Sequence, residues 1–163
     1  MKKFLSFSRI PIIVIFVAVS ACTTPLQKEL LKYTNEDWPE AAKLEKKAMD
    51  SYYSVIGKNY TDDITMYDVL TKEVLPNYKA FIEKLEDISK NLKEEKLINL
   101  HKECINIARQ YYLGFETAVE ALEKQDEKKV QEANNILSKA KSDMNKWQKD
   151  YEKLCAENNI TLE

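Results

Sequence analysis

The chain has 163 residues, a formal net charge of −2, two glycines and a single histidine. This length is enough for one domain with a substantial core, and the acidic balance argues against a nucleic-acid-binding protein. The scarcity of glycine, together with abundant Lys, Glu, Ala and Leu, indicates an all-helical domain.

Residues 1–21 have the pattern of a secretory signal peptide. Lys2, Lys3 and Arg9 give a basic start, and an apolar run follows at residues 10–19. The run is too short for a membrane-spanning helix, which needs about 20 apolar residues. It ends in Val19-Ser20-Ala21-Cys22, where two small residues precede a cysteine.

This ending resembles the bacterial lipoprotein signal, in which an aliphatic residue and two small residues precede an invariant cysteine. The resemblance implies cleavage after Ala21 and a diacylglycerol on the sulfur of Cys22, which would hold the protein on the cell envelope. Because Thr23 rather than Asp follows, it further implies the periplasmic face of the outer membrane in a Gram-negative host. In a Gram-positive host the protein would lie outside the cell membrane. The alternative is an ordinary signal peptide followed by an unmodified cysteine.

Residues 22–36 are predicted to be a tether with a short helix, and residues 37–163 a four-helix domain. The first domain helix is expected to begin near Asp37-Trp38-Pro39 and to end at Gly57. The second is expected to begin with a capping box at Thr65-Met66-Tyr67-Asp68 and to be kinked at Pro76. A complete break at Pro76 is the alternative. The second apolar stripe consists of Leu70, Val74, Tyr78, Phe81, Leu85 and Ile88.

The third helix is expected to be capped near Asn91 and the fourth to open at Asp126. The fourth stripe has a regular three-and-four spacing and consists of Val130, Ala133, Leu137, Ala140, Met144, Trp147, Tyr151 and Leu154. Such a seam, with short connections, predicts an antiparallel up-down-up-down four-helix bundle. The whole chain has the look of a small helical envelope lipoprotein, but it does not resemble a named domain family.

Counting residues from the turns places Pro76 level with Glu45, Cys104 and Trp147. This layer would hold a ligand cavity if the bundle has one, and otherwise Trp147 fills the space that the kink opens. The same counting places Gly114 level with Tyr67 and Leu137, and we expect the Tyr67 ring to pack on the bare backbone of Gly114.

The thiols and the histidine offer little chemistry. Cys104 and Cys155 are predicted to be free, because their register separates them by about 12 Å along the bundle. His101 and Cys104 alone are too few to hold a metal ion. We expect Cys104 to be a packed thiol, and His101 to be half-buried and to meet Asp150, which would raise its pKa.

The tyrosines are the strongest sign of an interaction surface. Tyr52-Tyr53 and Tyr111-Tyr112 occur as pairs, so the second ring of each pair is rotated away from the core. Tyr33, Tyr53, Tyr60 and Tyr112 are therefore expected to be partly exposed, although they could simply cover the flanks of the bundle.

We expect a lipid-anchored, non-enzymatic protein without a cofactor, which binds another envelope or secreted protein. The residues predicted to contact a partner or ligand are Tyr53, Tyr112, Trp147, His101 and Cys104. Two alternatives stay open: a small-ligand binder that uses the cavity near Pro76, Cys104 and Trp147, and an enzyme that uses Cys104 with His101.

Overall fold

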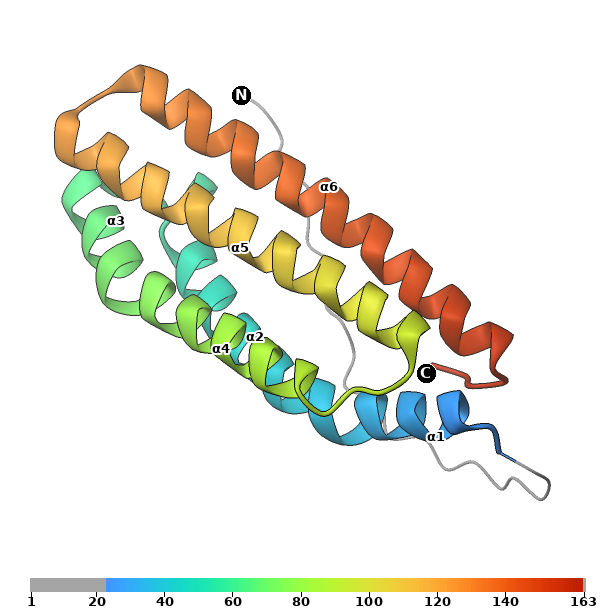
Figure 1. The fold of residues 1–163 in the computed structure, drawn as a ribbon. Helices are drawn as coiled ribbons and strands as arrows, with labels where there is room; N and C mark the ends of the chain where they lie inside the picture. Colours follow the sequence, from blue (N-terminus) through green and yellow to red (C-terminus); the bar gives the residue numbers. More distant parts are fainter. Residues whose placement is uncertain (1–22, 163) are drawn as a thin grey trace.

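A computed structural model describes residues 23–162, which are all-α, with no strand in that range. The predicted signal peptide and the lipid-attachment residue Cys22 lie outside the described residues. Four long helical segments follow one another (Figure 1). Their parts are α1 (Pro25–Lys32), the π turn η1 (Tyr33–Asp37) and α2 (Trp38–Ser54); the 3₁₀ turn η2 (Gly57–Asn59); α3 (Asp63–Val69), the π turn η3 (Leu70–Val74) and α4 (Leu75–Ser89); α5 (Glu95–Lys124); and α6 (Glu127–Glu157).

The first helix begins earlier than expected. Thr24 caps it through a capping box with Gln27, and Pro25 occupies its first turn. The helix then continues through η1 into α2, so α2 begins at Trp38 as predicted, but as the continuation of an earlier helix. Leu30 and Tyr33 are fully buried. The short helix predicted within residues 22–36 is therefore present, and its residues pack against the helical domain.

Helix α1 also completes the ends of two other helices. The Glu29 carboxylate accepts hydrogen bonds from the backbone N–H groups of Lys93 and Glu94, both 2.7 Å long, at the start of α5. The Gln27 side-chain amide donates to the carbonyl of Asn158, 2.8 Å away, at the end of α6. These bonds satisfy helix-terminal groups that have no partner within their own helix.

The two prolines that lie inside a continuous helical segment, Pro39 and Pro76, each follow a π turn. The N–H of Trp38 bonds to the carbonyl of Tyr33, and the N–H of Leu75 bonds to the carbonyl of Leu70, five residues back in both cases. The next residues are Pro39 and Pro76, which lack an N–H and whose rings would clash with the carbonyl four residues back in an α-helix. The wider turn removes this clash, so the second helix continues without a break at Pro76.

The second helix begins before the predicted capping box. Asp62 is its N-cap, and its carboxylate accepts from the backbone N–H of Thr65 at 2.8 Å. Thr65 is therefore already inside the helix, and the prediction of a cap at Thr65 is wrong. The predicted apolar stripe of this helix is confirmed, because all six of its residues from Leu70 to Ile88 are buried.

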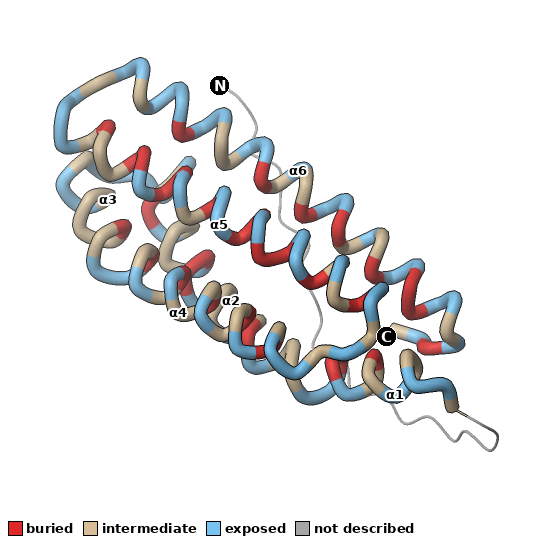
Figure 2. Tube along the Cα trace, viewed as in Figure 1, coloured by how far each residue is buried: buried red, intermediate tan, exposed pale blue. Residues whose placement is uncertain are grey.

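Helices α5 and α6 form a hairpin joined by a very short turn. Gln125 adopts the left-handed conformation, with φ 52°, and Asp126 caps α6 as expected. The α6 stripe packs inward from Ala133 to Leu154, but Val130 is 44% exposed and does not belong to it. Helix α5 lies beside α6 and α4, and α4 lies beside α2, with the buried residues on the facing sides (Figure 2).

Gly114 allows the close approach of α5 and α6. A Cβ atom at Gly114 would lie 2.6 Å from Cδ2 and 2.7 Å from Cγ of Leu137. The prediction that the Tyr67 ring packs on Gly114 is wrong, because the neighbour is Leu137. The Tyr67 hydroxyl instead donates to the carboxylate of Glu123 at 2.8 Å.

Figure 1 shows that the molecule has two different ends. One end, called the α1 end here, holds residues 23–32, 90–94 and 158–162. The other, called the far end, holds the connection between α2 and α3 and the turn between α5 and α6.

Candidate functional site

The histidine lies inside the α1 half of the domain. His101 on α5 has no exposed surface. Its Nε2 lies 2.8 Å from the carbonyl oxygen of Leu85, and its Nδ1 lies 2.9 Å from the hydroxyl of Tyr33. A carbonyl can only accept, so Nε2 carries the hydrogen and the Tyr33 hydroxyl donates to Nδ1.

This environment keeps His101 neutral. Burial lowers the pKa of the imidazole, which is the opposite of the predicted effect of Asp150. The predicted half-buried position is also wrong, because Tyr33 of the η1 turn covers the ring with a face-to-edge contact at 5.5 Å. With both nitrogens engaged away from solvent, His101 serves as a structural link between the first, second and third helices.

Trp147 fills the same half of the core. Its ring stacks on Tyr151, with centroids 5.5 Å apart and an interplanar angle of 2°, and its centroid lies 5.1 Å from that of Trp38. Its Nε1–H donates to the carbonyl of Leu100 at 2.8 Å. Trp147 thus packs against the start of α2 and the first part of α5. The predicted layer of Trp147 with Pro76 does not form, and Pro76 is exposed.

The two described cysteines are free and fully buried, as predicted for Cys104 and Cys155. Burial raises the pKa of both thiols, which disfavours the reactive thiolate. His101 and Cys104 share α5, but the hydrogen bonds of His101 go to Tyr33 and Leu85. The arrangement therefore does not give Cys104 an activating base.

A second group of polar side chains gathers around Glu45 on α2. Burial alone raises the pKa of the Glu45 carboxyl from 4.5 to about 7, with no hydrogen bond or cation of a described residue acting on it. Its charge acts on Tyr78 of α4 and on Cys104 and Tyr111 of α5, and raises the pKa of each after the larger effect of burial. It also acts on Tyr53 of its own helix.

Two hydroxyls of this group have no hydrogen-bond partner among the described residues. They belong to Tyr78, which is completely buried, and to Tyr111, which is 4% exposed. Their rings have centroids 5.8 Å apart, and the Phe115 ring lies 5.3 Å from that of Tyr78. A buried polar group without a partner destabilises the folded state, so this cluster requires an explanation.

The sequence does place Glu45 in an unusual position, although the apolar periodicity alone does not identify it as a site residue. Glu45 occupies a position between Ala41 and Ala48 on the apolar face of α2. The register placed it level with Cys104, whose pKa the Glu45 charge raises after the larger effect of burial, but did not single it out as a site residue.

The exposed apolar side chains gather away from the α1 end. Among the described residues, the strongly exposed large hydrophobic side chains are Tyr60 (47%), Ile64 (78%), Leu113 (45%) and Val130 (44%). Tyr60 and Ile64 flank the start of α3, Val130 lies in the first turn of α6, and Leu113 lies in the far half of α5. Tyr53 and Tyr112 are half-buried, whereas the expectation that Tyr33 is exposed is wrong.

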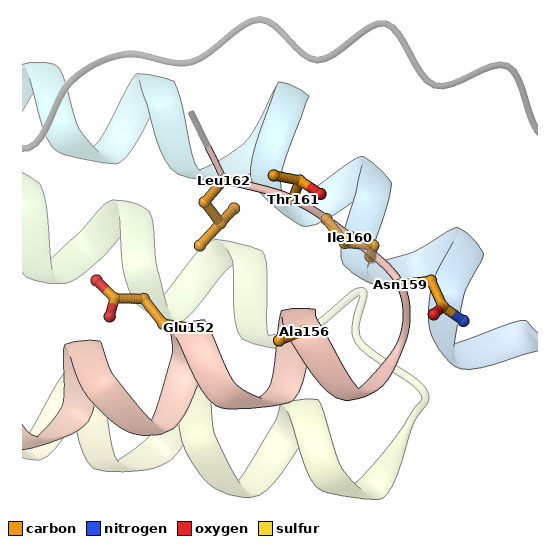
Figure 3. A pocket seen from close by; sticks show the side chains of 6 residues that line it. All are labelled: Glu152, Ala156, Asn159, Ile160, Thr161 and Leu162. Atoms are coloured by element: carbon orange, nitrogen blue, oxygen red, sulfur yellow. The ribbon is translucent and has the colours of Figure 1, made fainter.

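Two shallow hollows lie outside these groups. One, of about 590 Å³, is formed where the C-terminal segment folds back beside α6, between Glu152 and Leu162 (Figure 3). The other, of about 340 Å³, lies between α4 and α5 near Glu86 and Arg109, which form an ion pair. Neither includes Pro76, Cys104 or Trp147, the residues of the predicted cavity.

No protein-family model, curated protein or solved structure matches the chain. Within residues 23–162, no cluster of three or more His, Cys, Asp or Glu side chains is arranged to hold a metal ion. None of the helices in that range is long and apolar enough to cross a membrane.

Proposed function

We propose that the chain is a lipid-anchored envelope protein without enzymatic activity, which binds another envelope or secreted protein through its far end. Lipid on Cys22 would lie only two residues before the α1 cap, Thr24. The hydrogen bonds of Glu29 and Gln27 tie α1 to α5 and to the end of α6. An anchor attached there would hold the α1 end at the bilayer and direct the far end away from it.

We also propose that the four segments form the antiparallel up-down-up-down bundle that the sequence predicts. Pairs between α2 and the second helix support opposite directions, since Glu40 pairs with Lys84 and Ser51 bonds to Glu73. The hairpin of α5 and α6 supports the same arrangement, since Trp147 bonds to Leu100 whereas Lys129 pairs with Glu120. In such a bundle α5, which has 30 residues, extends about 45 Å from the membrane side to the far end.

The observation that carries the proposed function is the position of the exposed apolar side chains. Tyr60, Ile64 and Val130 lie at the far end and Leu113 lies in the half next to it, where a partner in the envelope space could reach them. Exposed aromatic and aliphatic side chains are common in protein contact surfaces. The buried His101 and the buried thiols support a non-enzymatic role.

Site-specific photo-crosslinking in the native envelope tests this function. A photoreactive amino acid in place of Ile64 is expected to give a discrete adduct with one partner protein. The matched control replaces Asn99, which is also exposed but lies on α5 near the α1 end, and is expected to give none. Adducts of equal yield at both positions, or at Asn99 alone, would contradict a far-end binding surface.

The anchor is tested separately by Cys22→Ser. The wild-type chain is expected to carry metabolically labelled fatty acid and to sediment with membranes, whereas the variant is expected to lose both properties. A variant that still carries the label would show that lipid is attached at another residue.

A further inference from the structure

We propose that the far end binds a basic surface of a partner protein, in which lysine and arginine side chains surround an apolar centre. This inference rests on the proposed function and adds the chemistry of the partner to it. The surface concerned, called the far-end surface here, consists of the exposed side chains of Tyr60, Ile64 and Val130 together with the carboxylates of the same segments.

The apolar side chains come from segments that meet at the far end. Ile64 lies one turn before Tyr67 on the same face of α3, and the Tyr67 hydroxyl donates to the carboxylate of Glu123 in the last turn of α5. This bond holds α3 beside the turn between α5 and α6, and Val130 lies in the first turn of α6 (Figure 1). The Tyr60 hydroxyl donates to the side chain of the first residue of α3, 2.7 Å away.

The negative charge of the described chain is concentrated in the same part of the molecule. The rings of Tyr52 and Phe115, 5.0 Å apart, mark one level across α2 and α5. Residues 52–72 and 113–137 lie at or beyond this level, and they contain nine carboxylates and five lysines. The other described residues contain 17 carboxylates and 17 lysine or arginine side chains, so their charge is balanced. The whole excess of negative charge therefore lies beside the exposed apolar side chains.

Few of these nine carboxylates are neutralised within the molecule. Glu120 pairs with Lys124 and Lys129, and Asp68 pairs with Lys72. Two carboxylates thus engage three of the five lysines. The other seven form no salt bridge with a described residue, so most of the negative charge of the far end is available to a partner.

The sign of this charge decides which occupant fits the apolar side chains. A second copy of the chain would bring the same negative excess, and an anionic bilayer would repel it as well. Within residues 23–162 no group of three or more carboxylates could hold a metal ion, which argues against a divalent cation. A protein that presents apolar side chains inside a ring of Lys and Arg covers Tyr60 and Ile64 and balances the carboxylates around them.

Photo-crosslinking from position 64 of the full chain in isolated envelopes tests this inference in two further backgrounds. The far-end triple variant carries Glu116→Gln, Glu123→Gln and Glu127→Gln. The control triple variant carries Glu83→Gln, Glu95→Gln and Glu103→Gln. All six carboxylates are exposed and form no salt bridge with a described residue, and each variant loses one acidic residue from the first turn of a long helix.

We expect the adduct yield to fall at least about threefold in the far-end triple variant and to stay unchanged in the control triple variant. Raising the salt concentration from about 0.1 M to about 1 M shortens the screening length from about 10 Å to about 3 Å. It should therefore lower the yield in the unsubstituted background and change it much less in the far-end triple variant. Mass spectrometry of the adduct should place the crosslink on a surface of the partner that is rich in Lys and Arg.

The outcomes separate this inference from the proposed function. An adduct whose yield is the same in all three backgrounds, or that falls equally in both triple variants, would overturn the basic partner and leave far-end binding in place. A crosslink to an acidic surface, or to a second copy of the chain, would overturn the basic partner as well. Absence of any adduct from position 64 would overturn the proposed function itself.

Discussion

Replacing Glu45 with Gln should stabilise the protein at neutral and alkaline pH. In the folded state the pKa of this carboxyl is about 7, against 4.5 as its ordinary value. One pKa unit corresponds to about 1.4 kcal/mol, so the difference sets an upper bound of about 3 kcal/mol on the destabilisation. Because Glu45 is half-buried and water screens part of this effect, we expect a gain of about 1–3 kcal/mol in the variant.

The sign of the pH dependence follows from which state ionises first. Below pH 4.5 the carboxyl is protonated in both the folded and the unfolded chain, so it imposes no penalty. Between pH 4.5 and about 7 the unfolded chain ionises while the folded chain holds its proton, and stability falls as the pH rises. Above about pH 7 the penalty is constant. The Glu45 charge raises the pKa values of Tyr53, Tyr78, Cys104 and Tyr111, so these groups stay uncharged in this range.

Chemical denaturation of the wild type and of Glu45→Gln between pH 4 and pH 8 measures this effect. The two proteins should have similar free energies of unfolding near pH 4 and should separate progressively up to about pH 7. Taking the difference between them at each pH removes the contributions of all other groups, His101 included. A difference that is constant with pH, or a variant that is less stable at pH 8, would refute the reasoning.

Three other predictions follow from the core. The single histidine signal in an NMR titration should have a midpoint below 6.5, because burial lowers the pKa of His101; a midpoint at or above 6.5 would contradict its buried, neutral state. Gly114→Ala should destabilise the protein by about 1 kcal/mol, because the clash of the new Cβ with Leu137 costs more free energy than the higher helix propensity of Ala returns. Thermal unfolding measures this cost, which should be smaller when Gly114→Ala is made in a Leu137→Ala background. Iodoacetamide should label Cys104 and Cys155 only after denaturation, as read by mass spectrometry, and rapid labelling of the native protein would restore Cys104 as a reactive thiol.

Apolar spacing predicted the second helix well because its core residues repeat along one face. The same reasoning failed at Val130, which lies in the first turn of α6, because the buried interface between α5 and α6 does not extend to that turn. Helix α6 packs mainly on α5, so Val130 in its first turn has little else to pack against. Periodicity shows which side of a helix is apolar but cannot show where along the helix its neighbours end.

His101 was misplaced for a related reason. A lone polar residue beside an apolar stripe is usually half-exposed, and its burial depends on partners from other helices. Those partners are the Tyr33 hydroxyl and the Leu85 carbonyl, and Tyr33 was assigned to a tether. Once the first helix is known to begin at Pro25, a donor and an acceptor for both ring nitrogens are in reach, and complete burial follows.

The two π turns explain why the continuity of the first helix from α1 into α2 was missed, and they supply a rule that the sequence does contain. From the core residue Tyr33 to the core residue Ala41 is eight positions, which is one residue more than two α-helical turns. The extra residue of a π turn brings both onto one face, with Pro39 two positions before Ala41. The second helix repeats this arrangement from Leu70 to Tyr78, with Pro76 again two positions before the second core residue. An eight-residue spacing of core positions around a proline therefore indicates a continuous helix with a π turn. The proline alone suggests a helix start in the first case and a kink in the second. It does not show whether the core positions before and after it lie on the same face of one helix.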